Sequence, residues 1–431
     1  MALGSGCEVR CRASGDVFGV SAAVISSSRR SWSSCWCSCR SSDRSPRRKS
    51  FPPRNRLTAP PQTPIIIPPG EPIVLGYSGP LTGALSDETP DFAIGGVLGW
   101  KELNGDEIHG HPIDLVGEDD GGVEADIAIT AARLLIERPR LVGVVGPAFS
   151  GAAAAAIDTF AAAGVVTISG SATRTDLTLS QAQPSFFFRT AFTNAAEGPL
   201  QAQILVDRLG VGNAFIIDQA EPFSIDLAIS AQSELLISGW TAVRSAVAPG
   251  TVDFTSLIAT ILEIAPDAVV FEGFNPDGAL LLGQLRDAGY AGVFLGGDAL
   301  VSQAAFIDVL GGDAEGAIFT GCAVALSDDF TRIWSATGAP TLPQISLTGN
   351  TADAAFLLID AVAEVAEPLP DGSLRIDPIR LRDAIAAVET IGWATGQSIA
   401  FDRNGDRMGQ GTETGLVACE VRNGAFVELT S

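Results

Sequence analysis

The sequence contains few of the residues on which enzyme chemistry most often depends. Its 431 residues include two histidines, His109 and His111, and two lysines, Lys49 and Lys101. Neither lysine stands in the Gly-Lys-Ser/Thr context of a phosphate-binding loop, which excludes an ordinary P-loop. One glycine separates the histidines in "HGHP", which we expect to be a solvated turn. The segment "GPAFSG" around Ser150 does not match the Gly-x-Ser-x-Gly elbow of serine hydrolases. Serine hydrolase and Schiff-base chemistry are therefore disfavoured.

Cysteine is scarce after the first 50 residues. Only two of the seven cysteines, Cys322 and Cys419, lie beyond them, and two cysteines are too few for a metal-ligand cluster. A disulfide in an oxidising compartment and a pair of buried free thiols both remain open, with free thiols as the default expectation.

Long apolar runs and basic charge are also missing from most of the chain. No run approaches the ~18 apolar residues that cross a bilayer. Residues 1–70 contain 11 Lys and Arg against 3 Asp and Glu, whereas residues 71–431 contain 16 against 47. So acidic a body would repel nucleic acid, and we predict no nucleic-acid partner.

The first 72 residues differ from the rest. Residues 1–50 are rich in Ser, Arg and Cys and show no hydrophobic periodicity. Their longest apolar run, Val17 to Ile25, is short and precedes its basic cluster, unlike an export signal. We expect residues 1–50 to be disordered or absent from the mature protein. Residues 51–72 contain eight prolines and predict a semi-rigid, Pro-rich linker.

From residue 73 onward, strand patterns alternate with helix patterns in two similar sets. The first set places strands at 73–78, 113–118, 141–146 and 165–169, and the second at 213–218, 241–247, 267–273 and 292–297. Further helices are predicted at 302–311, 351–366 and 378–388, and antiparallel strands near the C-terminus. Two doubly wound parallel sheets of this kind form an α/β fold with two lobes and a ligand cleft at the carboxyl ends of the strands.

Hydroxyl side chains follow two neighbouring strands of the first set. Ser150 begins an alanine-rich helix after "LVGVVG", and "VVTISGSATRTDLT" offers Ser169, Ser171 and Thr173 after the next strand. Each hydroxyl alone is best explained as a helix cap. Two such loops side by side at a helix N-terminus predict a site for a small carboxylate.

One metal pattern is present and is better explained otherwise. Asp402, Asn404, Asp406 and Glu413 match positions one, three, five and twelve of a calcium loop, but Arg407 replaces the glycine that the sharp turn needs. The flanking segments predict strands, and Asn404-Gly405 predicts a hairpin turn. We therefore expect no metal site, and the absence of Gly-x-Gly-x-x-Gly after a strand gives a dinucleotide cofactor little support.

Seven motifs in order give the chain a resemblance to a known family. They are "IVLGYSGPLTG", "DLVGEDD", "VVGPAFSG", "SGSATRTDLT", "FFFRTAFTN", "TVDFTSLIATI" and "FDRNGD". With their spacing, they resemble the type I periplasmic solute-binding proteins of branched-chain amino-acid ABC importers, over about residues 72–431. Individually the motifs are weak, and the first 70 residues lie outside the resemblance.

The resemblance implies a type I periplasmic binding protein fold, with two Rossmann-like lobes joined by a hinge. The N-terminal lobe would comprise residues 73–191 plus about 322–400, and the C-terminal lobe residues 192–321 plus about 401–431. The implied function is that of an extracytoplasmic, non-enzymatic monomer without a cofactor. It would close over a small amino-acid-like ligand and deliver it to an ABC transporter permease. The location would be periplasmic or extracellular, with the N-terminal region as the candidate membrane anchor.

The resemblance also assigns candidate ligand-binding residues. Ser150 matches the serine that receives the ligand α-carboxylate, and the loop of Ser171, Ala172 and Thr173 matches the one that supplies a hydroxyl and backbone groups. Asp298, in "FLGGDA", matches the acid of the second lobe that meets the α-ammonium. A zwitterion bound in this way would couple the two lobes.

Three further candidates depart from the family pattern or leave a choice open. Phe223 stands where a tyrosine is frequent, which keeps a ring for cation–π contact but removes the hydroxyl. Glu88, after "GPLTG", either favours a cationic or hydroxylated ligand or faces solvent. Phe274 either lines the pocket or fills the core.

Two other functions remain as alternatives. The same body could serve as a sensor that reports an amide or amino acid to a signalling partner. An enzyme on a two-lobe α/β scaffold is the weaker alternative, because histidine and lysine are so few.

Overall fold

The structure is a computed structural model, and it describes residues 63–83, 90–179, 185–210, 212–322, 326–336, 347–409 and 415–429. All described residues belong to one compact unit, Thr58–Ser431, so the expectations for residues 1–50 lie outside them. None of the helices in these ranges has the length and apolar character that a membrane span requires.

A six-stranded sheet forms the centre of the first lobe, in the order β3-β4-β2-β5-β6-β7. Its elements in chain order are β2 (Ile73–Gly79), α1 (Pro90–Asn104), β3 (Glu107–Ile108), β4 (His111–Asp119), α2 (Ala125–Ile136), β5 (Leu141–Val145), α3 (Ser150–Ala163), β6 (Val166–Ser169), α4 (Asp176–Leu179) and β7 (Phe187–Arg189). All neighbouring strands run parallel except β3 and β4. The four strands predicted here, at 73–78, 113–118, 141–146 and 165–169, are present.

The local sequence explains the junction at which β5 leads into α3. All five residues of β5 are buried, as expected of a strand covered on both faces. Alanine, the best helix former, supplies eight of the fourteen residues of α3, and Gly164 ends the helix in the left-handed conformation at φ 72°. Ser150 therefore lies where a buried strand meets a helix N-terminus.

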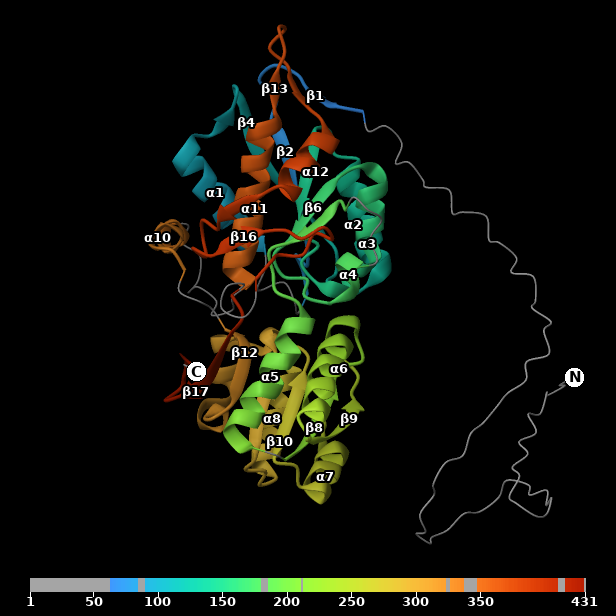
Figure 1. Cartoon of the computed structure of the whole chain (residues 1–431), viewed down its shortest axis with the longest axis vertical. Helices are drawn as coiled ribbons and strands as arrows, with labels where there is room; N and C mark the ends of the chain where they lie inside the picture. The colour runs from blue at the N-terminus through green and yellow to red at the C-terminus, as the bar shows by residue number, and fades with distance from the viewer. Residues whose placement is uncertain are drawn as a thin grey trace, which may run out of the picture. The chain divides into compact units, whose positions relative to one another are not determined.

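A seven-stranded sheet forms the second lobe, in the order β18-β17-β12-β11-β10-β8-β9. Its elements are α5 (Asn194–Leu209), β8 (Asn213–Asp218), α6 (Pro222–Ile237), β9 (Thr241–Ala246), α7 (Thr255–Ile264), β10 (Ala268–Glu272), α8 (Asp277–Asp287), β11 (Val293–Gly296), β12 (Ile318–Cys322), β17 (Val417–Arg422) and β18 (Ala425–Glu428). Helices α5 and α6 lie against one face of this sheet (Figure 1). Because β17 and β18 are antiparallel additions, the sheet is mixed rather than purely parallel.

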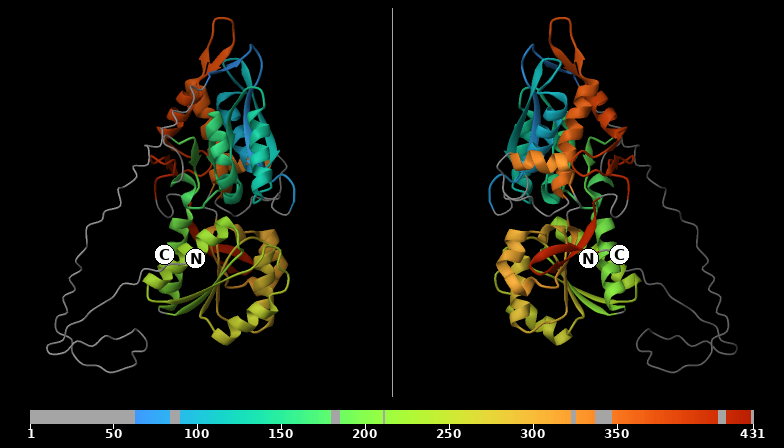
Figure 2. Two further views of the ribbon diagram at one scale, coloured as in Figure 1. Left: turned by 90° about the vertical axis from the view of Figure 1, so that its right-hand side faces the viewer. Right: turned by 90° about the vertical axis from the view of Figure 1, so that its left-hand side faces the viewer.

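The chain passes between the lobes after β7, after β12 and after β16. Between the last two passages it forms α10 (Asp328–Ala336), α11 (Leu347–Val365), β13 (Glu367–Pro368), β14 (Leu374–Ile376), α12 (Pro378–Ala386), β15 (Glu389–Ile391) and β16 (Ser398–Ala400). Buried residues of α11, β14 and α12 share one hydrophobic cluster with β2 and β6 of the first lobe. The C-terminal strands, in red in Figure 2, then lie among the elements of the second sheet.

Two local expectations need correction. The predicted linker, residues 51–72, contains strand β1 (Ile65–Ile67), which pairs with β14 and buries Ile67 completely. The helix expected at 302–311 is a π-helical turn, Gln303–Ile307, followed by one α turn, Asp308–Leu310. Gly311, at φ 56°, ends the α turn, and a 3₁₀ turn, Gly311–Ala314, follows.

A disulfide joins Cys322 at the end of β12 to Cys419 in β17. The default expectation of free thiols was therefore wrong. Both cysteines are buried, and the strands that carry them are antiparallel neighbours in the second sheet. Two cysteines 97 residues apart give no sequence signal for this pairing, because only strand order brings them together.

Candidate functional site

The two hydroxyl loops of the first lobe are joined by direct hydrogen bonds. The Arg174 backbone N–H donates to Ser150 Oγ over 3.1 Å, and the Ser171 hydroxyl donates to the Ala148 carbonyl over 2.6 Å. The Ser169 hydroxyl donates to the Pro147 carbonyl over 2.7 Å. The loops after β5 and β6 therefore form one surface, as their predicted positions on neighbouring strands require.

Thr173 is the member of this surface with an unused polar group. Its side chain is 1% exposed, and its Oγ1 has no hydrogen-bond partner among the described residues. Ser150 is also buried and uses its Oγ as an acceptor, so its own O–H is left to donate. The N–H of Ala152, in the first turn of α3, is taken by the Gly122 carbonyl, so fewer helix N–H groups remain for an anion than the sequence suggested.

Arg189, at the end of β7, holds the loop that carries Thr173. It is fully buried and donates to the carbonyls of Ala172 and Arg174 over 3.0 and 2.6 Å. Its Nε donates to Asp406 Oδ1 over 2.5 Å. The sequence prediction missed this residue, although it stands in the quoted motif "FFFRTAFTN", where a charged residue directly follows a buried strand.

Asp298, the acid predicted in the second lobe, lies just after the carboxyl end of β11. It is 2% exposed, its N–H donates to Glu197 Oε1 over 3.0 Å, and its Oδ1 accepts from the Ala299 N–H over 2.9 Å. Gly321, on the neighbouring strand β12, adopts φ 78°, and a Cβ there would overlap the Cβ of Asp298. The loop is therefore closely fitted around this carboxylate.

Asn194, the first residue of α5, connects the two halves of the candidate site. Its backbone N–H donates to the Thr173 carbonyl over 2.9 Å, and its Nδ2 donates to the Phe223 carbonyl over 3.1 Å. Three residues later in the same helix, Glu197 accepts from the Asp298 N–H. The first turn of α5 thus links the hydroxyl loop, through Asn194, to the Asp298 loop, through Glu197. Asn194 was also missed, and the position of a helix start at the crossover is its only sequence signal.

Three phenylalanines form a row that spans both lobes. The ring centroids of Phe149 and Phe274 are 5.5 Å apart, and those of Phe274 and Phe223 are 5.4 Å apart. Phe149 directly precedes Ser150 in the first lobe, whereas Phe223 and Phe274 belong to the second. The structure therefore brings together two predicted residues, Phe223 and Phe274, with one that the sequence reasoning missed.

A second contact between the lobes lies next to the hydroxyl loop. Thr175 donates from both its N–H and its Oγ1 to Asp226 Oδ2, each over 2.9 Å. Asp226 belongs to α6, one turn after Phe223. This pair, like the phenylalanine row, forms across the boundary that a hinge motion would open.

Two other sequence candidates have different outcomes. Glu88 lies outside the described residues. His111 is 2% exposed, with its ring nitrogens 2.9 Å from the Glu71 carbonyl and 3.3 Å from the Gly372 carbonyl, so the expectation of a solvated turn was wrong for this residue. His109 is exposed.

The acids of the calcium-like pattern serve the local turn and the core. Asp402 Oδ1 accepts from the N–H groups of Asn404 and Asp406, and Asp406 pairs with Arg189. Glu413 lies outside the described residues. Within the described ranges, no group of three or more His, Cys, Asp or Glu side chains is arranged to hold a metal ion.

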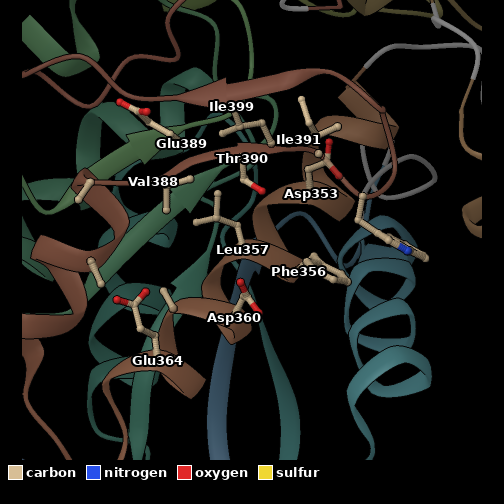
Figure 3. A pocket seen from close by; sticks show the side chains of 15 residues that line it. Asp353, Phe356, Leu357, Asp360, Glu364, Val388, Glu389, Thr390, Ile391 and Ile399 are labelled. Carbon is tan, nitrogen blue, oxygen red and sulfur yellow. The ribbon is translucent and has the colours of Figure 1, made fainter.

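A cavity of about 340 Å³ lies elsewhere in the first lobe (Figure 3). It is lined by residues of α11, α12 and β15, including Asp353, Asp360 and Glu364, and by Trp393, which follows β15. None of the predicted site residues that the structure describes lines it. The candidate site at the carboxyl ends of the strands is therefore separate from this cavity.

Known proteins resemble this chain over most of its length. A family model described as "Periplasmic binding protein" matches residues 72–414. A Leu/Ile/Val-binding protein from Rhizobium johnstonii is 29% identical over 299 residues, which cover 69% of this chain and 80% of the relative.

Solved structures share the fold. A leucine-binding protein from Thermotoga maritima superposes with a TM-score of 0.71 at 21% identity, over 83% of this chain and 98% of its own. A branched-chain amino-acid transporter substrate-binding protein from Streptococcus pneumoniae, in complex with isoleucine, gives 0.69 at 21% identity, over 83% and 100%. The two-lobe α/β fold, the seven motifs and the match over residues 72–414 lead to one conclusion: the chain belongs to the periplasmic binding protein family.

Proposed function

We propose that the chain binds a small amino-acid zwitterion between its two lobes. Ser150 and Thr173 donate hydrogen bonds to the ligand carboxylate, and Asp298 receives the ligand ammonium. Phe149, Phe223 and Phe274 border the ligand on the apolar side. Carboxylate and ammonium are thus bound by different lobes, so a ligand that carries both groups favours closure.

The observation that carries this proposal is the joined hydroxyl surface with one unused, buried hydroxyl. Thr173 Oγ1 lacks a partner, and a buried polar group without one costs about 1–3 kcal/mol, which a ligand carboxylate would recover. The hydrogen bonds through Asn194 and Glu197 support the same arrangement, because they tie this surface to the Asp298 loop.

The relatives support a role in transport outside the cytoplasm. They include Leu/Ile/Val-binding proteins and substrate-binding proteins of branched-chain amino-acid ABC transporters. We infer that this chain delivers its ligand to an ABC importer and acts without chemical turnover. Stimulation of ATP hydrolysis by a candidate ABC importer, reconstituted in liposomes, tests delivery. Ligand that returns unchanged after prolonged incubation tests the absence of turnover.

Thermal unfolding of the full chain with three related compounds tests the zwitterion model. Leucine carries both charged groups, 4-methylpentanoate lacks the ammonium, and isopentylamine lacks the carboxylate. We expect leucine, or another member of an amino-acid panel, to raise the melting temperature, and its two half-analogues to do so far less. Equal effects of an amino acid and its deaminated analogue would exclude a role for Asp298 as the ammonium partner.

Two variants and one control assign the contacts. Ser150→Ala and Asp298→Ala should each weaken ligand binding by roughly 1–3 kcal/mol in calorimetric titrations, because each removes a partner of a charged ligand group. Ser256→Ala, on the exposed face of α7, should leave the affinity unchanged. Unchanged affinity in both site variants would contradict the proposal.

A further inference from the structure

Two glutamates lie fully buried next to the Asp298 loop. Glu197 is in the first turn of α5, and Glu272 is the last residue of β10. Both are 0% exposed, and neither takes part in an ion pair among the described residues. A buried carboxyl without a cation needs another means of stabilisation, since isolated buried charges are costly.

The two carboxyls converge on the backbone just before Asp298. A Cβ placed on Gly297 would lie 2.7 Å from Glu272 Oε2 and 3.5 Å from Glu197 Oε1. Glu197 Oε1 also accepts from the Asp298 N–H over 3.0 Å and from Thr320 Oγ1 over 2.6 Å. Glu197 therefore contacts the loop directly, and Glu272 packs beside it.

The polar atoms left over in this cluster are mostly acceptors. Glu197 Oε2, both carboxyl oxygens of Glu272 and Gln201 Oε1 are buried without a hydrogen bond of normal geometry among the described residues. Gln201 is 1% exposed; one N–H of its Nε2 donates to Thr320 Oγ1, and its amide, as the one donor beside Glu272, lowers the pKa of that carboxyl only in part. Ionised carboxylates cannot satisfy one another, whereas a protonated carboxyl supplies an O–H donor.

We propose that Glu197 and Glu272 form a proton-holding pair that positions the Asp298 loop, so that this loop and the ligand affinity it supports depend on pH. The effect on affinity rests on the function proposed above, whereas proton holding by the pair does not. Glu197 and Glu272 act here as positioning residues, because neither is assigned a contact with the ligand.

The electrostatic surroundings support the pair. Burial, followed by the charge of Glu272, raises the pKa of Glu197 to about 8. Burial, followed by the charge of Asp298, raises the pKa of Glu272 well above its ordinary value. The facing groups are Asp298 from the β11 loop, Thr320 from β12, Gln201 from α5 and the apolar Leu227 from α6. No cationic side chain of the described residues contributes to either shift.

The sign of the pH effect follows from these directions. In the unfolded chain both glutamates ionise near their ordinary pKa of 4.5, whereas in the folded chain they keep their protons to higher pH. The folded state therefore binds more protons between those values, and stability falls as pH rises through this window. Each group changes the folding equilibrium by up to about tenfold per pH unit there.

Denaturant unfolding of the full chain between pH 6 and 8, without ligand, tests proton holding. The folding equilibrium constant of the wild type should fall with pH more steeply than that of Glu272→Gln, by up to about tenfold per pH unit, because glutamine keeps the shape and cannot ionise. Glu263→Gln, on the exposed surface of α7, is the control and should follow the wild type. Profiles of wild type and Glu272→Gln that run parallel would overturn the proposal.

A second variant guards against a folding failure of the first. Glu197→Gln keeps an acceptor for the Asp298 N–H and the Thr320 hydroxyl, and it should also flatten the profile. If neither variant folds, the wild type alone decides, because stability that does not fall from pH 6 to 8 contradicts the pair.

Calorimetric titration with leucine over the same pH range tests positioning. The affinity of the wild type should fall as the pair loses its protons, and that of Glu272→Gln should stay level. Proton-dependent stability combined with a pH-independent wild-type affinity would overturn the positioning role. If no amino acid binds at any pH, the proposed function fails, whereas the unfolding profiles still decide whether the pair holds protons.

Discussion

The two lobes offer the proposed ligand different chemistry. The first lobe offers hydroxyls, among them Ser150, which accepts from the Arg174 N–H, and Thr173, whose Oγ1 has no partner among the described residues. The second lobe offers Asp298 next to two buried glutamates without cations. A neutral hydroxyl is cheap to bury, whereas a carboxylate is stabilised only by its surroundings. Binding determinants in the second lobe should therefore depend on pH and on precise support more than those in the first.

The second lobe also contains a disulfide, between two strands of its sheet. Its removal should have the largest effect on stability. Cys322 and Cys419 lie 97 residues apart in the sequence. The chain between them leaves the second lobe, forms α10 to β16 in the first lobe and then returns. The loss of such a constraint in Cys322→Ala/Cys419→Ala should cost about 4 kcal/mol, because the unfolded chain gains loop entropy. Equilibrium unfolding in urea measures this, and the wild type with reductant should lose a similar amount. A loss below about 1 kcal/mol would show that the second lobe does not depend on the bond.

The sequence predicts helices and strands well where the hydrophobic period is strong. It predicts poorly the features that depend on which strands are neighbours in a sheet. The buried strands at 141–145 and 213–218 and the alanine-rich helix α3 follow from hydrophobic pattern and propensity. Strand β1 was hidden in a proline-rich segment, because three isoleucines are too short a run to distinguish from a linker. The disulfide and the antiparallel β17 and β18 depend on strand order, which local sequence does not encode.

Arg189 supports the Thr173 loop in the first lobe, as Glu197 supports the Asp298 loop in the second. Its replacement should have the next largest effect on stability. Arg189→Met removes the donors to the Ala172 and Arg174 carbonyls and leaves Asp406 without its cation. We expect a loss of about 3 kcal/mol in unfolding free energy, typical of breaking a buried pair on one side. Ligand affinity should fall as well, since the loop of Thr173 loses its support.

Two further variants make the Arg189 result specific. Arg138→Met removes an arginine whose side chain is 49% exposed and paired with Glu118, and it should change stability by less than about 1 kcal/mol. Asp406→Asn combined with Arg189→Met should cost less than the two single changes added together, because the residues share one interaction. Additive losses would contradict the coupling of this pair.

The sequence predicted the candidate site residues that directly follow a strand. It missed the residues that hold a loop of the site in place. Ser150 and the Ser171–Thr173 loop follow neighbouring strands, so topology alone places them together. Arg189, Asn194 and Glu197 were missed because their partners are backbone groups far along the chain. A carbonyl or an N–H leaves no mark in a sequence, so residues that position a loop are harder to find than residues that face a ligand.

The smallest expected effect concerns the contact that joins the lobes. Asp226→Ala removes the acceptor for the Thr175 N–H and hydroxyl, and this bond forms only when the lobes lie close together. Ligand affinity should fall by about 1 kcal/mol, the usual net value of such a bond, while the unfolding free energy changes less. Thr175→Val should have a similar effect, and the double variant should lose no more than the single ones.

Calorimetric titration with the ligand found by thermal shift measures these affinities, and Asp207→Ala, on the exposed surface of α5, is the matched control. Affinity equal to that of the wild type in both Asp226→Ala and Thr175→Val would mean that the contact does not contribute to the ligand-bound state. A lower affinity with unchanged stability would instead separate closure from folding, because a bond that belongs to only one arrangement of the lobes weakens ligand binding without weakening either lobe.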